Sequence, residues 1–371
     1  MKKFLSGFLS VFFLAAMVIF ALTLMYFNFL VLWQRVILIV LFTLLGFLAL
    51  KGIKHRSNLT SVVSLLILLL VIGFDVTSSY YIYSFYTSYG RIFKPAEHWE
   101  QGENESPITS DHPGFNLYIS GIDTFGPLKT QSRSDVNIVF SVNPTTGKGL
   151  ITTVPRDTYA RIADGGKNRY DKLTHSGNYG VKSSLHTLEN LFDINIPYYV
   201  RVNFNSLIKI VDTVDGIDID NPYAFKIKNG TRYAKGRIHL NGTQALDYAR
   251  ERNHLKDGEL ERGRHHVVII KAILDKVLSP QIVMRAHSLL AIMEEYVETN
   301  MPSDVLTGLI NQQIEKGTKW NFDSGQLGGK PRMGLPSYAM PGSKLYMYVP
   351  DPQSIKELSE KMNKIVEEKD E

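Results

Sequence analysis

Residues 115–142 read FNLYISGIDTFGPLKTQSRSDVNIVFSV and decide the fold of the water-soluble part of the chain. Two runs rich in β-branched and aromatic residues, Phe115 to Ile122 and Val136 to Val142, are separated by turn-forming and polar residues, which predicts two strands. A third run of this kind, Leu150 to Val154, follows a Thr-Thr-Gly turn and predicts another strand.

Helices are predicted further along the chain by the helical spacing of apolar residues. They cover residues 181–192, 204–211, 243–250, 262–278, 283–297, 303–315 and 352–368, with a strand at Tyr198 to Val202 between the first two. Strands that alternate with helices indicate an α/β layered domain.

The first 83 residues are much more apolar than the rest and predict a membrane anchor. Apolar stretches run from Phe4 to Phe27, Val36 to Leu50 and Leu59 to Tyr80. A span needs about 20 apolar residues, and the second stretch reaches that length only if residues 29–33 contribute. No small-residue cleavage site follows the first stretch, which argues against a cleaved signal peptide. We therefore expect three transmembrane helices.

Basic residues predict the orientation of this multi-pass anchor. They lie at positions 2–3, before the first span, and at positions 51–56, between the second and third, whereas the first connection holds only Arg35. By the positive-inside rule, the N-terminus and the second connection are cytoplasmic, and everything after Tyr80 lies outside the cell membrane.

The charge of the chain is unevenly distributed. The membrane segment accounts for the whole formal net charge of +5, because its basic residues are offset only by Asp75, so the remainder is neutral. We expect no nucleic-acid partner, since the neutral part has no net basic charge and the cytoplasmic segments are too short for a DNA-reading module. Cysteine is absent, which excludes disulfides, thiolate metal sites and a cysteine nucleophile.

A polar segment with several prolines, Lys94 to Gly114, separates the anchor from the strands and predicts a stalk. We divide the chain into an anchor at residues 1–83, a stalk or linker at 84–114 and one α/β domain at 115–371.

Several arginines stand beside acidic residues at the ends of predicted elements. The groups are Arg133 with Asp135, Arg156 with Asp157, Arg250 and Arg252 around Glu251, and Arg262 next to Glu261. Asp123 closes the first strand and Asp135 opens the second, so if the strands are neighbours the two carboxylates can hold a divalent cation. Arginine complements them because its planar fork binds phosphate oxygens in a bidentate manner. Two carboxylates together with several arginines predict a pyrophosphate site with Mg²⁺, or with Mn²⁺ as the alternative.

Each of these pairs, taken alone, is more often a solvated surface feature. On a regular helix Arg250 and Arg252 would face different directions, and they converge only if the helix ends near Arg250. His265 and His266 have no metal-ligand partner at helical spacing, which favours an ordinary helix surface. The apolar runs at 267–274 and 289–293 are more often core, although they could wall a groove for a polyprenyl tail.

The sequence resembles the LytR-CpsA-Psr family of Gram-positive cell-envelope proteins from about Phe115 to Val349. The resemblance rests on Gly121-Ile122-Asp123-Thr124, Ser132-Arg133-Ser134-Asp135, Val154-Pro155-Arg156-Asp157, Tyr170-Asp171-Lys172-Leu173-Thr174-His175, Tyr248-Ala249-Arg250-Glu251-Arg252 and Glu261-Arg262-Gly263. Three spans before the domain are similar to the capsule-associated CpsA branch.

This resemblance implies an extracytoplasmic α/β domain with a central mixed β-sheet flanked by helices. It implies a polyprenyl (undecaprenyl) pyrophosphate glycan as substrate, with the lipid in a hydrophobic tunnel and the pyrophosphate at its mouth. The implied activity is transfer of a capsular polysaccharide or similar anionic glycan to peptidoglycan, which forms a phosphodiester bond. The implied partners are these substrates, the cell membrane and capsule assembly machinery.

The family's site residues carry over position by position. Asp123 and Asp135 match the magnesium-binding aspartates, and the arginines that match the pyrophosphate contacts are Arg133, Arg156, Arg250, Arg252 and Arg262. The chain departs from the family at Glu259 and Glu261, where relatives commonly carry Asp, and at His266, where they commonly carry Gln. We keep His266 among the pyrophosphate-binding residues. Asp157 or a metal-bound carboxylate is expected to accept the proton of the attacking hydroxyl.

Two other activities fit the same residues. With water as acceptor, the site would be a pyrophosphatase that releases glycan phosphate. Without turnover, the chain would be a regulator of capsule assembly that only binds the lipid-linked glycan. The products distinguish the three possibilities.

Overall fold

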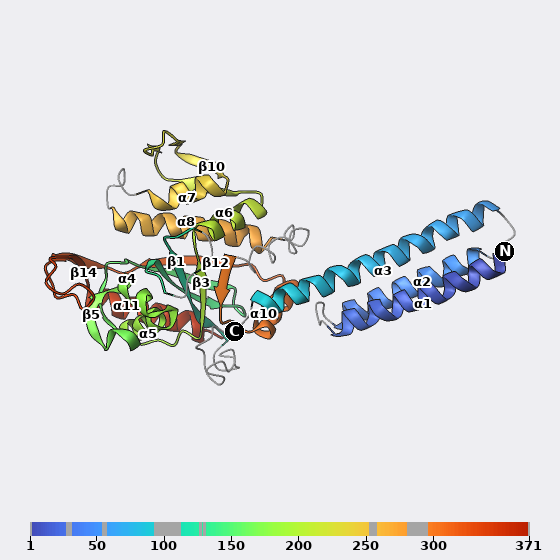
Figure 1. The fold of residues 1–371 in the computed structure, drawn as a ribbon, viewed down its shortest axis with the longest axis horizontal. Coiled ribbons are helices and arrows are strands. Elements are labelled where there is room, and N and C mark those ends of the chain that lie inside the picture. The colour runs from blue at the N-terminus through green and yellow to red at the C-terminus, as the bar shows by residue number, and fades with distance from the viewer. Residues whose placement is uncertain are drawn as a thin grey trace. The chain divides into compact units, whose positions relative to one another are not determined.

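The computed structural model describes residues 2–26, 32–53, 58–92, 113–125, 128, 131–251, 258–279 and 296–369. The chain divides into two compact units (Figure 1). One holds residues 1–90 together with 307–316, and the other holds residues 91–306 and 317–371, which form the α/β domain.

The N-terminal helices are α1 (Lys2–Tyr26), α2 (Leu32–Ile53) and α3 (Asn58–Ile92). Their segments Phe8–Tyr26, Leu32–Ile53 and Leu59–Tyr83 are each long and apolar enough to cross a membrane. The predicted second span therefore has its full length, because α2 already begins at Leu32. α3 continues to Ile92 through positions that we assigned to the stalk, and residues 93–112 lie outside the described part of the chain. The division of the chain at 83 and 114 stays a prediction.

The α/β domain is built on a mixed six-stranded sheet with the order β11-β6-β1-β2-β3-β12. The strands are β1 (Phe115–Ile122), β2 (Ser134–Asn143), β3 (Lys148–Val154), β6 (Tyr198–Val202), β11 (Val297–Thr299) and β12 (Asn321–Gln326). β1, β2 and β3 form an antiparallel meander, and β6 and β12 add to it in parallel on either side. This confirms the predicted fold class.

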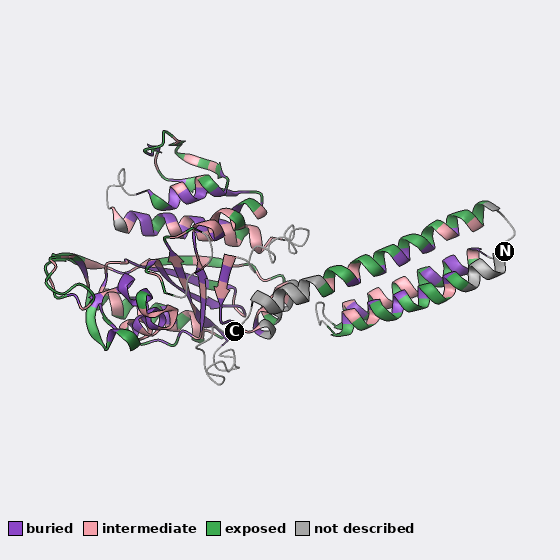
Figure 2. Ribbon diagram, viewed as in Figure 1, coloured by how far each residue is buried: buried purple, intermediate pink, exposed green. Residues whose placement is uncertain are grey.

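Helices cover both faces of this sheet (Figure 1). The helices of the domain are α4 (Leu173–Ser176), α5 (Val181–Phe192), α6 (Phe204–Thr213), α7 (Gly242–Arg250), α8 (Glu259–Val277) and α11 (Pro352–Glu367), whereas most of α10 (Ser303–Lys316) belongs to the first unit. On one face, Tyr118 and Val139 of the sheet are buried against Leu188 of α5 and Met362 of α11. On the other face, α8 contacts β3 and β12. β2 and β3, in the middle of the sheet, are buried over nearly their whole length (Figure 2).

A second apolar core lies between α8 and the elements that pack on α8 without belonging to the six-stranded sheet. Val211 of α6, Ile219 of β7 and Tyr248 of α7 pack there against Ile269 and Ala272 of α8. Paired short strands complete the domain: β4 (Tyr159–Ile162) with β5 (Arg169–Lys172), β7 (Ile217–Asn221) with β10 (Gly236–Leu240), β8 (Phe225–Lys226) with β9 (Arg232–Tyr233), and β13 (Gly329–Met333) with β14 (Tyr346–Pro350).

One predicted helix needs a correction. The apolar spacing predicts a helix over 283–297, but Val297 opens strand β11 because it pairs antiparallel with Val202 of β6. Residues 283–295 of that prediction lie outside the described residues. The edge strand β12 was not predicted at all, since its sequence, NFDSGQ, lacks the apolar alternation of a half-buried strand.

Candidate active site

A β-bulge sets the position of Asp135. Gly121 of β1 pairs with Val136 and the next residue, Ile122, pairs with Ser134, so Asp135 is the extra residue on β2. Bulges bend a strand and redirect a side chain, and they are frequent beside active sites. Asp123 follows Ile122 directly, so the register brings the two predicted metal ligands to the same end of neighbouring strands.

Buried hydrogen bonds hold the bulge in place. The Ser134 hydroxyl lies 2.9 Å from that of Ser120 and donates to the carbonyl of Val136 at 3.0 Å. The hydroxyl of Tyr118 donates to Asn137 Oδ1 at 2.7 Å, and Asn137 donates back to the carbonyl of Ser134. Because each of these groups is buried, loss of one would leave an unsatisfied partner, and the network therefore fixes the backbone that carries Asp135.

Charges of alternating sign extend from Asp135. Arg156 Nη1 donates to Asp135 Oδ1 at 2.7 Å, and Arg156 Nε lies 3.8 Å from Asp157 Oδ2. The other oxygen of Asp157 accepts from Lys172 Nζ at 2.7 Å. No role was predicted for Lys172 from the sequence, although a lysine next to an aspartate in a family motif was a usable signal. The structure places it in direct contact with a predicted site residue.

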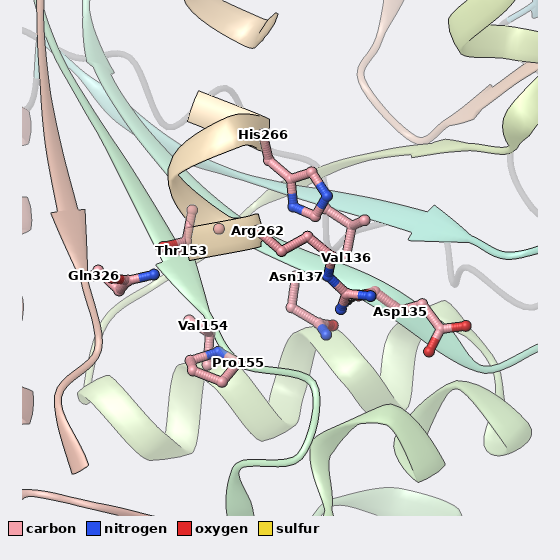
Figure 3. Close-up of a pocket in the computed structure, with 10 residues that line it drawn as sticks. Asp135, Val136, Asn137, Thr153, Val154, Pro155, Arg262, His266 and Gln326 are labelled. Carbon is pink, nitrogen blue, oxygen red and sulfur yellow. Dashed lines mark hydrogen bonds between the residues drawn. The ribbon is translucent and has the colours of Figure 1, made fainter. Parts of the chain in front are cut away.

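Arg262 reaches the same bulge from α8 (Figure 3). It is 4% exposed, and its Nη2 donates to the backbone carbonyl of Asp135 at 3.2 Å. The next residue, Gly263, makes this approach possible, because a Cβ there would lie 2.6 Å from Gln326 Nε2 and 3.1 Å from Thr153 Oγ1. The glycine of the Glu261-Arg262-Gly263 motif thus allows the helix to pack closely on β3 and β12.

A small pocket opens between these elements. Asp135, Arg262 and His266 line it together with Thr153 and Gln326 (Figure 3). His266 lies one helical turn after Arg262, and its Nε2 is 3.1 Å from the carbonyl of Ala249 on α7. The structure therefore gathers three of the predicted site residues in one pocket and joins Arg156 to it through Asp135.

Arg250 lies at the other carboxylate. α7 ends at Arg250, since Glu251 is extended with φ −62° and ψ 133°, and this meets the condition set for Arg250 and Arg252 to converge on one ligand. Its guanidinium lies 4.4 Å from the centre of the Phe204 ring, and its Nη2 is 4.0 Å from Asp123 Oδ1. The structure thus pairs Arg250 with the second predicted metal ligand.

Two predicted arginines gain no support from the contacts that the structure describes. Arg133 is exposed and forms no ion pair within the described part of the chain. Its backbone is nevertheless fixed, because the flanking Ser132 donates to the carbonyl of Gly177 at 3.1 Å and a Cβ on Gly177 would clash with the 132–134 backbone. Arg252 lies outside the described residues, so its role stays a prediction.

The donor set fits a magnesium ion but makes no complete cage. No group of three or more His, Cys, Asp or Glu residues that could hold a metal is present among the residues described. Mg²⁺ is typically held by one or two carboxylates, and water and substrate phosphates fill its remaining positions. Asp123 and Asp135, at one strand end and beside arginines, match that requirement.

His265 corrects one expectation. We predicted an ordinary helix surface for it, but its side chain is 2% exposed and stacks on Tyr248 with ring centres 4.1 Å apart. Its Nδ1 lies 3.0 Å from the carbonyl of Tyr248. Burial lowers the pKa of this imidazole, although the Tyr248 carbonyl and nearby Glu261 and Glu251 oppose the shift. His265 is therefore part of the second core, beside the pocket but not in it.

Sequence reasoning also missed Asp171 as a structural centre. Asp171 Oδ1 accepts from the Ser337 hydroxyl at 2.9 Å and lies 2.7 Å from His175 Nδ1, while Oδ2 accepts from the Ala339 backbone at 2.6 Å. The segment 336–342 is thereby tied to β5, the strand that carries Lys172.

The predicted walls of a lipid groove are described only in part. Ile269 and Ala272 of the first run are buried in the second core, which agrees with the expectation that these residues are ordinary core. The second run, 289–293, lies outside the described residues.

Known proteins resemble this chain over most of its length. Residues 80–364 match the LytR_cpsA_psr family. The polyisoprenyl-teichoic acid–peptidoglycan teichoic acid transferase TagU of Bacillus subtilis is 26% identical over 85% of this chain and 98% of its own length. TagU of Bacillus licheniformis is 28% identical over 84% of this chain and 99% of its own length.

Among solved structures, Bacillus subtilis TagV superposes with a TM-score of 0.58 at 26% identity, over 70% of this chain and 99% of TagV. The curated relatives named here are teichoic acid transferases and not capsule proteins, so the expected capsule-associated branch gains no support. The family match extends over most of the chain, including every predicted site residue. The chain belongs to the LytR-CpsA-Psr family.

Proposed function

We propose that the chain is a Mg²⁺-dependent transferase that moves an anionic glycopolymer from a polyprenyl pyrophosphate carrier to peptidoglycan. The observation that carries this proposal is the convergence of Arg156 and Arg262 on Asp135 at the bulge of β2. Two guanidinium groups beside a carboxylate are suited to bind pyrophosphate oxygens, because arginine forks recognise phosphate in a bidentate manner.

The names of the relatives support the choice of substrates. TagU is a transferase of polyisoprenyl-linked teichoic acid to peptidoglycan, and this chain aligns with nearly its whole length. A teichoic-acid-like polymer is therefore the first candidate for the transferred glycan. A capsular polysaccharide is the second candidate, favoured by the three apolar helices before the domain.

In the proposed reaction, a sugar hydroxyl of peptidoglycan attacks the glycan-side phosphorus. The phosphoanhydride bond breaks, polyprenyl phosphate leaves, and a phosphodiester forms. Arg156, Arg250 and Arg262 neutralise the charge that develops on the phosphate oxygens, which is the main task of a protein in phosphoryl transfer. When bound by Asp123 and Asp135, Mg²⁺ would supply further charge neutralisation.

Asp157 is our candidate for the group that takes the hydroxyl proton. It is the carboxylate of this cluster that the metal proposal leaves unused, and it lies within 3.8 Å of Arg156. Lys172, bound to its other oxygen at 2.7 Å, holds the carboxylate in place.

We further propose that the domain lies outside the cell membrane, on the basis of the positive-inside rule. The absence of cysteine allows a direct test. A single cysteine introduced as Lys330→Cys should react with a membrane-impermeant maleimide in intact cells. Labelling only after lysis would contradict the orientation.

The transferase activity is tested with the full-length protein in liposomes. The assay contains synthetic polyprenyl pyrophosphate teichoic acid or capsule repeats, Mg²⁺ and peptidoglycan oligomers, and products are identified by mass spectrometry. A glycan–phosphate–peptidoglycan adduct that is lost in Asp135→Ala is the expected result. Free glycan phosphate would indicate the pyrophosphatase, and binding without product would indicate the regulator.

A further inference from the structure

The hairpin of β4 and β5 presents an exposed face next to the proposed active site. In its register, Tyr159 pairs with Lys172, and Arg161 pairs with Tyr170. Side chains alternate between the two faces of a strand, so these four residues share one side. The other side is formed by residues such as Ala160, which is buried in the domain.

The side chains on this face are held by stacking. The rings of Tyr159 and Tyr170 lie 4.9 Å apart with an interplanar angle of 25°, and the guanidinium of Arg161 lies 5.2 Å from the centre of the Tyr170 ring. A cation held against an aromatic ring has already lost part of its conformational freedom, so less entropy is lost when it binds a ligand.

Arg161 is nevertheless available to a ligand. It is exposed, as is Tyr170 at 44%, and no carboxylate pairs with Arg161 in the part of the chain that the structure describes. A stacked guanidinium with free N–H groups is suited to bind an external carboxylate. The neighbouring hairpin, residues 329–350, adds basic side chains and has no acidic residue in its sequence.

The face lies next to the groups to which we assign the reaction. Lys172, at one end of it, binds Asp157, the carboxylate to which we assign the proton of the attacking hydroxyl. The molecule that carries that hydroxyl must approach Asp157, and the Tyr159–Tyr170–Arg161 stack extends from Lys172 along the same side of the hairpin.

We propose that this face, defined by Tyr159, Arg161, Tyr170 and Lys172, is the acceptor subsite, where Arg161 binds a carboxylate of the peptidoglycan strand. This proposal rests on the proposed function. Charge complementarity supports this occupant, because the stem peptides of peptidoglycan carry carboxylates and Arg161 has no acidic partner among the described residues, whereas Lys172 is bound to Asp157.

The test uses Arg161→Gln in the full-length protein, with Arg169→Gln as the matched control. Arg169 lies on the same hairpin but shares its side with Asp171, and its guanidinium lies over Tyr338 at 5.0 Å. Binding of soluble peptidoglycan oligomers is measured calorimetrically, alongside oligomers whose carboxylates have been amidated. Unfolding temperatures verify that both variants fold.

We expect Arg161→Gln to weaken binding of the native oligomers by about threefold to fivefold, the upper part of the range for an exposed ion pair. Arg169→Gln should bind like the wild type, and amidated oligomers should not distinguish the wild type from Arg161→Gln, because the two changes remove the same interaction. In the transfer assay, the KM for peptidoglycan should rise while kcat stays unchanged.

Equal binding of native oligomers by Arg161→Gln and the wild type would overturn the subsite. So would an equal loss in Arg169→Gln, or a loss of affinity for the lipid-linked donor with unchanged affinity for the oligomers. If the wild type binds oligomers but never transfers, the proposed function fails, while the binding comparison still decides the subsite.

Discussion

Asp135 joins Arg156 and Arg262, because its side chain accepts from Arg156 at 2.7 Å and its backbone carbonyl accepts from Arg262 at 3.2 Å. These arginines come from the turn after β3 and from the first turn of α8, on the side of the sheet that α8 covers. One residue of a bulge therefore couples two parts of the chain that are far apart in sequence.

Asp135→Asn should reduce transfer by about 100-fold or more, because it removes a fixed charge from the reacting site. The fold should survive, since the bulge network and the Arg262 bond to the backbone do not involve the carboxylate. The steady-state transfer rate and the unfolding temperature check both expectations. Asp323→Asn, at an exposed position of β12, is the control and should have no effect.

Arg262→Lys should lower transfer by about 10-fold to 100-fold, since lysine keeps the charge but loses the planar fork. Because Arg262 is almost fully buried, we also expect a lower unfolding temperature. Arg264→Lys, on an exposed side chain of the same helix, is the matched control. Full activity in Arg262→Lys would show that only the charge matters.

Asp171 should make the stability of the domain sensitive to acid. Burial raises the pKa of its carboxyl, but hydrogen bonds from His175, the Ala339 and Lys172 backbones and Ser337 outweigh burial and lower the pKa below its ordinary value of 3.8. A carboxyl with a lower pKa in the folded state stabilises above its unfolded pKa, and this contribution is lost as the pH falls through the folded pKa.

The wild type should therefore exceed Asp171→Asn in stability by about 2 kcal/mol at pH 7, because the amide cannot replace every accepted hydrogen bond. The difference should shrink below about pH 4. Thermal unfolding across this range measures it. A difference that is independent of pH would mean that the hydrogen bonds do not depend on the charge of Asp171.

Replacement of Asp75 should stabilise the membrane helices. Asp75 is fully buried in α3, and neither carboxylate oxygen has a hydrogen-bond partner within the residues that the structure describes. Such burial costs free energy, so Asp75→Leu should raise the unfolding temperature of the detergent-solubilised protein. Val76→Leu, at an exposed neighbouring position, should leave it unchanged. A destabilised Asp75→Leu would indicate that the carboxylate has a polar partner in the membrane.

The sequence predicts the elements whose periodicity is strong. β1, β6 and α5 are observed where apolar spacing places them, because each buries one apolar side against the main core. β12 could not be found in this way, since its six residues depend on pairing with β3 and not on an apolar face of their own.

The candidate site was predictable in its residue types but not in its contacts. Spacing alone could not reveal that Asp135 is a bulge residue, since that depends on the register between β1 and β2. Nor could it show that Asp171 ties segment 336–342 to β5, because the two are distant in sequence. His265 was misassigned because a helix with apolar residues on most of its circumference does not show which side faces the second core.

The alternating charges of Lys172, Asp157, Arg156 and Asp135 have a consequence for ligand discrimination. Arg156 and Lys172 are each already compensated by an acidic neighbour, and these carboxylates would compete with an incoming anion. A simple anion such as free phosphate would have to displace a carboxylate from an arginine, and it would leave that carboxylate uncompensated. A ligand that brings its own divalent cation with its phosphates replaces both partners together. With the proposed Mg²⁺ dependence, the site would therefore select a phosphate ligand that arrives with its cation over the small free anions that surround it.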